Sequence, residues 1–349
     1  MPSRSDSPFS LSGPARGGWR SRRPGRATWA ALVAGIVAST GMATPPAVAA
    51  ATSGGPGSTG QVPGTILVAD PGVVDGGDAV GPGFVTLYQP GASGHASPEV
   101  VVTKGMAGPG GIAFDSSGDL WVANESGHVV EYGRAELAKA SPVPTVTLSY
   151  GGGGLAFDPS GNLWVINGSV VVEFTKAEIA KSGSPKPVRS LPDSCSVAFD
   201  PDGDLWEGST SDTVAEFTKA QLAKSGSVSP AVVITSADLN GPCKPAFDRL
   251  GDLWAGNYNT DTVVEFTKAQ LAKTTTLAPK VVISSPQNET PGDVAFDASG
   301  DLWVPTMGLH TVVEYTRAQL GKSGVPVPHV TISTNADTEN GPWAVAIEP

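Results

Sequence analysis

The sequence predicts an all-β chain that folds as a six-bladed β-propeller with four-stranded blades. One phrase, in which Ala-Phe-Asp and a glycine turn precede Leu-Trp, recurs five times. Its tryptophans, Trp121, Trp164, Trp206, Trp254 and Trp303, lie 43, 42, 48 and 49 residues apart. A period of about 40–50 residues with four strand-like runs per repeat is typical of propeller blades. Strand-like runs at the two chain ends, each lacking a partner, complete the pattern.

Each repeat contains the same predicted elements in the same order. The first strand ends at Ala-Phe-Asp, and an Asp-x-x-Gly turn leads into the second strand, where glycine suits the positive φ of a tight hairpin. The third strand, such as Thr262 to Phe266, is rich in β-branched residues, and a fourth follows, such as Ala231 to Thr235. Capping boxes predict a short helix between the third and fourth strands. They begin at Thr175, Thr218, Thr267 and Thr316.

The two chain ends are expected to close the ring together. Residues 65–70, 83–89 and 98–103 match the second, third and fourth strands of a blade that has no first strand. Residues 343–348 match a first strand that nothing follows. The C-terminal strand should therefore complete the N-terminal blade, which makes six blades and removes the open sheet edges. A structure with residues 344–348 outside that blade would contradict this count.

The N-terminal segment is typical of a secretory signal peptide. Residues 1–26 hold six Arg and one Asp, a mostly apolar run covers residues 27–43, and Ala47-Val48-Ala49 matches a cleavage site. The apolar run is short for a membrane span. We therefore expect a signal peptide over residues 1–49, a flexible leader over residues 50–63 and the propeller over residues 64–349. The Arg22-Arg23 pair leaves open the twin-arginine route as an alternative to general secretion.

The charge of the exported chain excludes several classes of partner. Removal of residues 1–49 takes away six Arg and one Asp, which moves the formal net charge from −11 to −16. Such an acidic protein repels phosphate backbones and anionic lipid surfaces. We expect a secreted or extracytoplasmic monomer whose partner is a small molecule, a glycan or an extracellular protein, with no nucleic acid and no membrane among its partners.

Cys195 and Cys243 are the only two cysteines, and each stands four residues before the Phe of Ala-Phe-Asp in adjacent repeats. Export to an oxidising compartment favours a disulfide between them. Two free thiols are the alternative, because a disulfide needs Cα atoms within about 7 Å and equivalent positions on neighbouring blades can lie farther apart.

The candidate ligand-binding residues lie at the expected channel mouth. The starts of the first strands and the ends of the second strands should share one face of the propeller, opposite the turns and helices. In this register the ring of polar and aromatic side chains comprises Asp70, Asn124, Asn167, Asn257, Lys244, Asp293 and Trp343. Lys244 is expected to pair with Asp293 of the next blade. Solvated loop ends with local hydrogen bonds are the alternative interpretation of the same ring.

Two further sets of residues repeat around the ring and are therefore interpreted as structural. The third strands carry Glu131, Glu173, Glu216, Glu265 and Glu314, which are expected to pair with Lys or Arg or to be exposed. One active site does not need five copies of its acid. The repeated tryptophans should pack between neighbouring blades, where each large aromatic ring can bury about 150–250 Å².

The repeat phrase resembles that of the NHL-repeat propellers over residues 64–349, and more distantly gluconolactonase-like (senescence marker protein) propellers and virginiamycin B lyase. The residues that carry the likeness are A-F-D-x-x-G-D/N-L-W-V-A-N and the following T-V-V-E-F. The gluconolactonase-like resemblance implies a divalent cation held by Glu, Asn and Asp in the channel. The lyase resemblance implies paired His and a Glu near the channel. The four histidines here are His95, His128, His310 and His329, in the first two and the last repeats.

These observations favour a propeller that binds a ligand or partner without catalysis, with no catalytic residue, metal or cofactor assigned. Two alternatives stay open: a metal-dependent lactonase-like hydrolase, which would hold a divalent cation in the channel, and a carbon–oxygen lyase. The repeat phrase does not decide among them, because most of it builds blades and one fold supports many functions.

Overall fold

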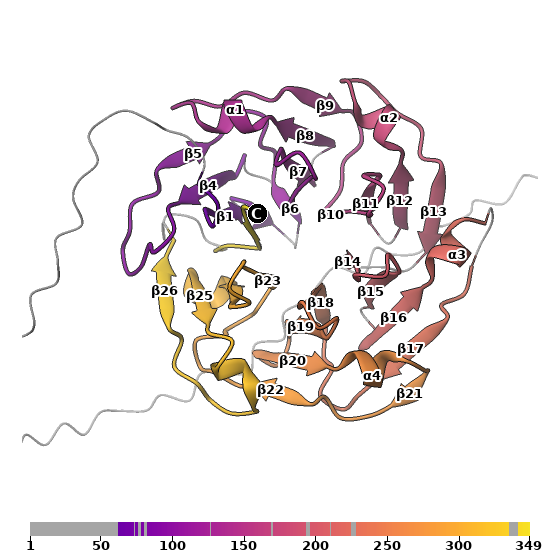
Figure 1. Ribbon diagram of the computed structural model, residues 1–349. Helices are drawn as coiled ribbons and strands as arrows, with labels where there is room; N and C mark the ends of the chain where they lie inside the picture. Colours follow the sequence, from indigo (N-terminus) through magenta and orange to yellow (C-terminus); the bar gives the residue numbers. More distant parts are fainter. Residues whose placement is uncertain are drawn as a thin grey trace, which may run out of the picture. The chain divides into compact units, whose positions relative to one another are not determined.

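A computed structural model describes residues 62–72, 74–75, 78–79, 82–125, 127–168, 170–192, 196–209, 211–224, 228–334 and 341–349. Over these residues six antiparallel sheets, each with four strands in the order inner to outer, surround a central axis (Figure 1). The chain is a six-bladed β-propeller. The predicted signal peptide and most of the predicted leader lie outside the described residues.

Blade one combines both ends of the chain, as predicted. Its strands, from the centre outward, are β27 (Ala344–Ile347), β1 (Ile66–Asp70), β4 (Phe84–Tyr88) and β5 (Val100–Val102). β27 pairs antiparallel with β1, with Ile347 opposite Ile66 and Ala344 opposite Ala69. A separate two-stranded sheet contains β2 (Val74–Asp75) and β3 (Asp78–Ala79).

The other five blades follow one another along the chain. Blade two contains β6 (Pro109–Phe114), β7 (Leu120–Asn124), β8 (His128–Tyr132) and β9 (Val146–Leu148). Blade three contains β10 (Gly154–Phe157), β11 (Leu163–Asn167), β12 (Val170–Phe174) and β13 (Arg189–Pro192). Blade four contains β14 (Ser196–Phe199), β15 (Leu205–Ser209), β16 (Thr213–Phe217) and β17 (Val232–Thr235), with β21 (Thr275–Thr276) added at its outer edge.

Blade five contains β18 (Pro242–Phe247), β19 (Leu253–Asn257), β20 (Thr262–Phe266) and β22 (Val281–Ile283). Blade six contains β23 (Ala295–Phe296), β24 (Leu302–Thr306), β25 (Thr311–Tyr315) and β26 (Val330–Ser333). Each first strand therefore lies next to the axis and each fourth strand lies at the rim, as Figure 1 shows.

Short helices connect the third and fourth strands, as the capping boxes predict. They are α1 (Arg134–Leu137), α2 (Lys176–Ile179), α3 (Lys219–Leu222), α4 (Lys268–Leu271) and the 3₁₀ turn η2 (Gln319–Gly321), and a further 3₁₀ turn, η1 (Met307–Leu309), follows β24. Reciprocal side-chain-to-backbone hydrogen bonds confirm the boxes at Thr175, Thr218 and Thr267. Thr316 forms the same pair of bonds with Gln319. The N-cap residue of α1 is Gly133, which has no side chain to cap the helix. No helix in the described part of the chain is long and apolar enough to cross a membrane.

The repeated tryptophans pack between blades, as predicted. Four of them lie edge-on to the Phe of Ala-Phe-Asp in the following blade, with ring centroids 5.8–6.1 Å apart. The pairs are Trp121–Phe157, Trp164–Phe199, Trp206–Phe247 and Trp254–Phe296. Edge-to-face aromatic pairs add about 0.5–1.5 kcal/mol to their burial. The Ala-Phe-Asp and Leu-Trp segments of the phrase thus join one blade to the next.

Candidate functional site

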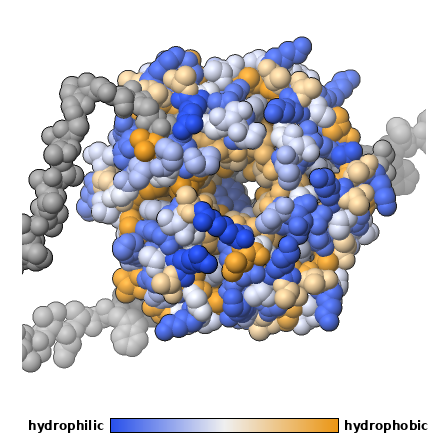
Figure 2. Space-filling view, in the orientation of Figure 1, coloured by the Kyte–Doolittle hydropathy of each residue, from blue (hydrophilic) through white to orange (hydrophobic). Residues whose placement is uncertain are grey.

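The central channel contains a cavity of about 310 Å³ at the axis of the propeller. All six first strands or the residues just before them contribute to its wall, in which most side chains are apolar while polar atoms, including those of the backbone, form about half of the exposed surface. The apolar lining includes Ile112, Leu155, Val197, Val294 and Val345, with Phe114, Phe157, Phe199 and Phe247 toward the Ala-Phe-Asp end. Figure 2 shows the molecule hollowed at the centre of the ring. A cavity of this size suits one small molecule.

Lys244 brings the only basic side chain into this lining. A register shift between Cys243 and Ala246 interrupts the pairing of β18 with β19, and Lys244 within it has φ +37°. Bulges re-aim side chains, and positive φ is uncommon for a residue with a Cβ atom. The Lys244 ammonium donates a hydrogen bond to the Gly110 carbonyl of blade two, on the far side of the channel from blade five. One side chain therefore crosses the channel.

Asp293 of blade six is the acidic partner of Lys244, as the sequence register predicts. Its Oδ2 lies 3.8 Å from the Lys244 Nζ. The carboxylate also accepts hydrogen bonds from the backbone N–H of Val294 at 2.8 Å and of Val345 at 3.3 Å. Burial raises the pKa of Asp293 to about 6, although Lys244 and the two N–H groups act in the opposite direction. Asp293 therefore changes charge just below neutral pH, beside the one cation of the channel wall.

The predicted amides Asn124 and Asn257 hold loops. Asn124 donates to the carbonyls of Gly105 and His128 and accepts from the N–H of Ala107. Asn257 donates to the Asp238 carbonyl and the Thr262 hydroxyl and accepts from the N–H of Asn240. Both side chains are fully buried. Each amide fastens the loop that precedes the first strand of its own blade, and neither is among the channel-lining residues.

The other three predicted residues are also outside the channel lining. Asn167 is exposed at the end of β11. Asp70 is buried and accepts a hydrogen bond from the Gly72 N–H at 2.9 Å. Trp343 is half-buried and donates its backbone N–H to the Ala69 carbonyl at 2.9 Å. Of the seven residues predicted at the mouth, the structure brings only Lys244 and Asp293 together in the cavity.

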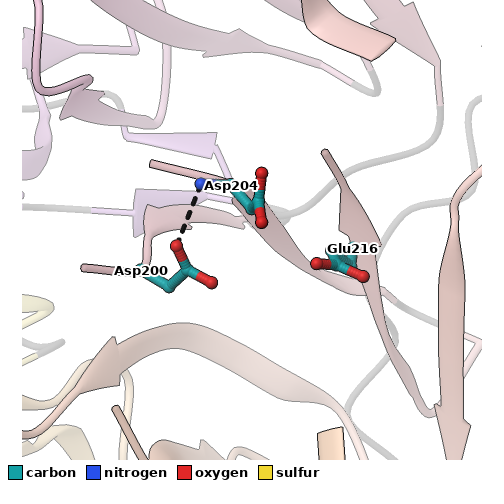
Figure 3. Close-up of side chains that lie close together, drawn as sticks. All are labelled: Asp200, Asp204 and Glu216. Carbon is teal, nitrogen blue, oxygen red and sulfur yellow. Dashed lines mark hydrogen bonds between the residues drawn. The ribbon is translucent and has the colours of Figure 1, made fainter. Parts of the chain in front are cut away.

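Clusters of acidic residues repeat on the opposite face, and Figure 3 shows one of them, Asp200, Asp204 and Glu216. Asp200 Oδ1 accepts from the N–H groups of Asp202 and Asp204, both at 2.9 Å, and its Oδ2 accepts from the Trp206 indole at 3.2 Å. Asp204 Oδ1 accepts from the Lys219 N–H at the start of α3, at 2.6 Å. The two aspartates therefore hold a turn and a helix, which explains why the phrase repeats them.

The repeated glutamates differ from blade to blade. Glu173 pairs with Arg189 at 2.6 Å and Glu265 with Lys280 at 2.9 Å, as expected. Glu216 and Glu314 instead lie against two aspartates each, and burial together with these neighbours raises both pKa values to about 7. The sequence predicts that each of these glutamates pairs with Lys or Arg or is exposed. This prediction is wrong for Glu314, which is buried and has no Lys or Arg within ion-pair distance among the described residues.

The four histidines are all described, and none of them lines the channel. The His128 ring contacts the Gly105 carbonyl at 3.0 Å, and the backbone N–H of His329 donates to the backbone carbonyl of Glu314 at 2.8 Å. Cys195 lies outside the described residues, so its disulfide with Cys243 stays a prediction.

Comparisons with known proteins support the fold of this chain and do not identify its function. No protein-family model matches the chain, and no curated protein matches it. A protein of unknown function from Bacteroides caccae has a similar structure, with a TM-score of 0.51 and 8% identity over 81% of this chain and 98% of that chain. An inactive virginiamycin B lyase from Staphylococcus aureus with quinupristin has a TM-score of 0.48 and 14% identity over 81% of this chain and 92% of that chain. The selenomethionine form of that lyase has a TM-score of 0.46 and 15% identity over 75% of this chain and 84% of that chain.

Proposed function

We propose that this chain is an exported binding propeller whose central channel holds one small molecule without transforming it. The ligand class that fits has an apolar body and one anionic group, such as a medium-length carboxylate. The apolar first-strand residues would cover the body, and the Lys244 ammonium would bind the anion. The observation that carries this proposal is the path of Lys244, which leaves a bulge with φ +37° and crosses the channel to the Gly110 carbonyl.

Backbone strain of this kind supports a functional interpretation. A positive φ at a residue with a Cβ atom costs about 1–3 kcal/mol and persists where the surrounding structure demands it. Lys244 and Asp293 are the two charged residues among the described residues that line the channel. Without the bulge that turns Lys244 toward the axis, Asp293 would lack this cation. A charge-assisted hydrogen bond to a carboxylate is worth about 1.5–3 kcal/mol in a site with little water. The apolar wall supplies the remaining affinity through the burial of the ligand's hydrocarbon part.

The two enzymatic alternatives have less support from the geometry. A cation in the channel would meet the Lys244 ammonium next to Asp293, while the Asn124 and Asn257 amides hold loops. The lyase alternative depends on paired histidines near the channel, and the four histidines lie elsewhere. Elemental analysis of the purified protein addresses the hydrolase, since stoichiometric calcium, zinc or manganese would favour it.

Calorimetric titration with octanoate, and with octanol as the uncharged match, tests the proposed ligand class. We expect octanoate to bind and Lys244→Met to weaken this binding about tenfold or more, because the variant keeps the apolar stem and removes the charge. Lys273→Met, a change of the same charge at an exposed lysine, is the control. Ala198→Leu should narrow the channel and weaken both ligands.

Equal binding by wild type and Lys244→Met would contradict the assigned role of the lysine. Consumption of octanoate or of a lactone panel during long incubation would contradict the non-catalytic part. Export is supported by the N-terminal sequence alone, and N-terminal sequencing of protein from the culture medium tests it: a start near residue 50 is expected.

A further inference from the structure

One tryptophan of the repeat lacks the hydrogen bond that its equivalents make. In four blades the indole N–H donates to the Asp of Ala-Phe-Asp in the same blade, at 3.2–3.5 Å. These pairs are Trp121–Asp115, Trp164–Asp158, Trp206–Asp200 and Trp303–Asp297. In blade five Trp254 is 2% exposed, and its Nε1 donates to no group among the described residues. A buried N–H without a partner costs about 1–3 kcal/mol, so it points to a group that would accept from it.

Trp254 lines a cleft of about 140 Å³ between blades five and six, on the face that carries the turns and helices. Glu265, 3% exposed, also lines it. Its Oε1 accepts from Lys280 at 2.9 Å, while its buried Oε2 accepts no hydrogen bond. Phe296 and Leu320 form an apolar wall of the same cleft. Two residues that line the cleft thus each carry a buried polar atom without a hydrogen-bond partner among the described residues.

The charges around the cleft select the class of ligand. Three acidic side chains, Asp248, Asp252 and Glu265, face three basic ones, Arg249, Lys280 and Arg317. The basic groups oppose a metal cation and the acidic groups oppose an anion, so a neutral molecule fits best. A hydroxyl group both donates and accepts, and therefore can satisfy Glu265 and Trp254 at once.

We propose that this cleft is a second binding site, distinct from the channel, for a small polyhydroxylated molecule no larger than a monosaccharide. The hydroxyl groups would accept from the Trp254 N–H and donate to the Glu265 carboxylate, and the carbon face would lie on Phe296 and Leu320. The volume of about 140 Å³ holds roughly ten water molecules, which is the scale of such a ligand. The sequence phrase gives no hint of the site, because Trp254 and Asp248 occupy the same repeat positions as the Trp and Asp of the four other blades that carry the phrase.

Nuclear magnetic resonance of the indole N–H groups tests the proposal directly in ¹⁵N-labelled full-length protein. Glycerol, myo-inositol and methyl glucoside are the probes, with acetate and phosphate as anionic comparisons. We expect the Trp254 indole resonance to shift and saturate with at least one polyol, while the Trp206 resonance, already bonded to Asp200, stays in place. Absence of any saturable shift, or equal shifts at all indoles, would overturn the proposal.

Variants identify the contact and guard against a folding defect. Trp254→Phe should remove the resonance and weaken polyol binding about tenfold or more by calorimetry, whereas Trp206→Phe should leave binding unchanged. Gly321→Leu is a second variant: Gly321 lines the cleft, its Cβ position is in open space, and a side chain there should obstruct the ligand. Unchanged binding in both Trp254→Phe and Gly321→Leu would overturn the site. A saturable shift of the Trp254 resonance with acetate or phosphate but with none of the polyols would overturn the polyol class.

Discussion

At the scale of single residues, Lys244 and Asp293 decide the chemistry of the channel. Lys244 reaches the axis because a bulge turns it there, and Asp293 lies in the next blade with its carboxylate 3.8 Å from the ammonium. An ionised Asp293 competes with any anionic ligand for Lys244 and also repels it. Because the pKa of Asp293 is raised to about 6, this competition is strong at pH 7.5 and weakens on acidification.

Binding of octanoate, under the proposed function, should therefore tighten several-fold when the pH falls from 7.5 to 5.5. The Asp293→Asn variant should bind at pH 7.5 as tightly as the wild type does at pH 5.5, and its affinity should change little with pH. Asparagine can still accept from the Val294 N–H through Oδ1, so the backbone contact is retained. Calorimetry at three pH values measures the effect, and an equally steep pH dependence in Asp293→Asn would contradict it.

The repeated glutamates give a second contrast between single residues. Burial raises the pKa of Glu173, but its partner Arg189 acts in the opposite direction. Glu216 lies beside Asp200 and Asp204 instead, and burial together with these two aspartates raises its pKa to about 7. Between its ordinary pKa of 4.5 and about 7, Glu216 holds more protons in the folded than in the unfolded chain. The free energy of unfolding therefore falls as the pH rises through this range.

Glu216→Gln should flatten this fall and make the protein more stable than the wild type at pH 8. Glu173→Gln is the matched variant at the same repeat position, and it should raise the stability at pH 8 less than Glu216→Gln does, because Arg189 offsets part of the cost of burying the Glu173 anion. Urea unfolding at pH 5, 6.5 and 8 compares them. If Glu173→Gln gains as much stability at pH 8 as Glu216→Gln does, the contrast between the two environments is wrong.

At the scale of elements, the segments that follow α2, α4 and η2 fasten their blades to the preceding ones. Gly183 of blade three and Gly324 of blade six form parallel bridges to Leu148 and Ile283. The serines just before these glycines accept N–H groups of the same neighbouring strands at 3.0 Å. β21 of the blade-five segment pairs with β17 in the same way. The sequence alone indicated only that these Ser- and Gly-rich stretches end the helices.

Gly324→Pro should weaken the junction between blades five and six, because proline removes the N–H that donates to the Val282 carbonyl at 3.0 Å. We expect a loss of about 1–2 kcal/mol in the free energy of unfolding. Hydrogen exchange should also accelerate in β22. Gly324→Ala is the control, since the Cβ position is open and the N–H remains. Equal stability of the two variants would show that this hydrogen bond contributes nothing measurable.

The repeat phrase predicts the architecture well and the site only in part. Hydrophobic alternation, Asp-x-x-Gly turns and capping boxes are local signals, so the strands and helices follow directly from them. Register places Asn124 and Asn257 correctly at the ends of their strands. It does not specify that these side chains turn to their own loops, because that depends on the path of residues 105–107 and 238–240. The reach of Lys244 across the channel depends on a bulge that no residue pattern marks.

At the scale of the whole molecule, the ring is held where the two chain ends meet. β27 supplies the innermost strand of blade one, and the Gly64 N–H and Glu348 carbonyl, as well as the Glu348 N–H and Thr65 carbonyl, bond at 2.9 Å. Gly94 of blade one bridges Ile332 of blade six. On the other side, the Arg134 guanidinium of α1 lies 2.9 Å from the Glu348 Oε1. Blade one is therefore fastened to both of its neighbours.

Removal of Arg134 should destabilise the closed ring more than neutralisation of Glu348 does. Glu348 is 2% exposed, and burial raises its pKa while Arg134 acts to lower it. Arg134→Met leaves a buried carboxylate without its cation, which we expect to cost about 1–3 kcal/mol near neutral pH, given that Arg134 is half exposed. Glu348→Gln removes the charge itself and should cost less. The double variant should therefore recover part of the loss seen in Arg134→Met, and urea unfolding of the four proteins at pH 7 gives the coupling. Strictly additive losses would mean that the ion pair does not stabilise the closure, which would then depend on the β27–β1 pairing and the Gly94 bridge.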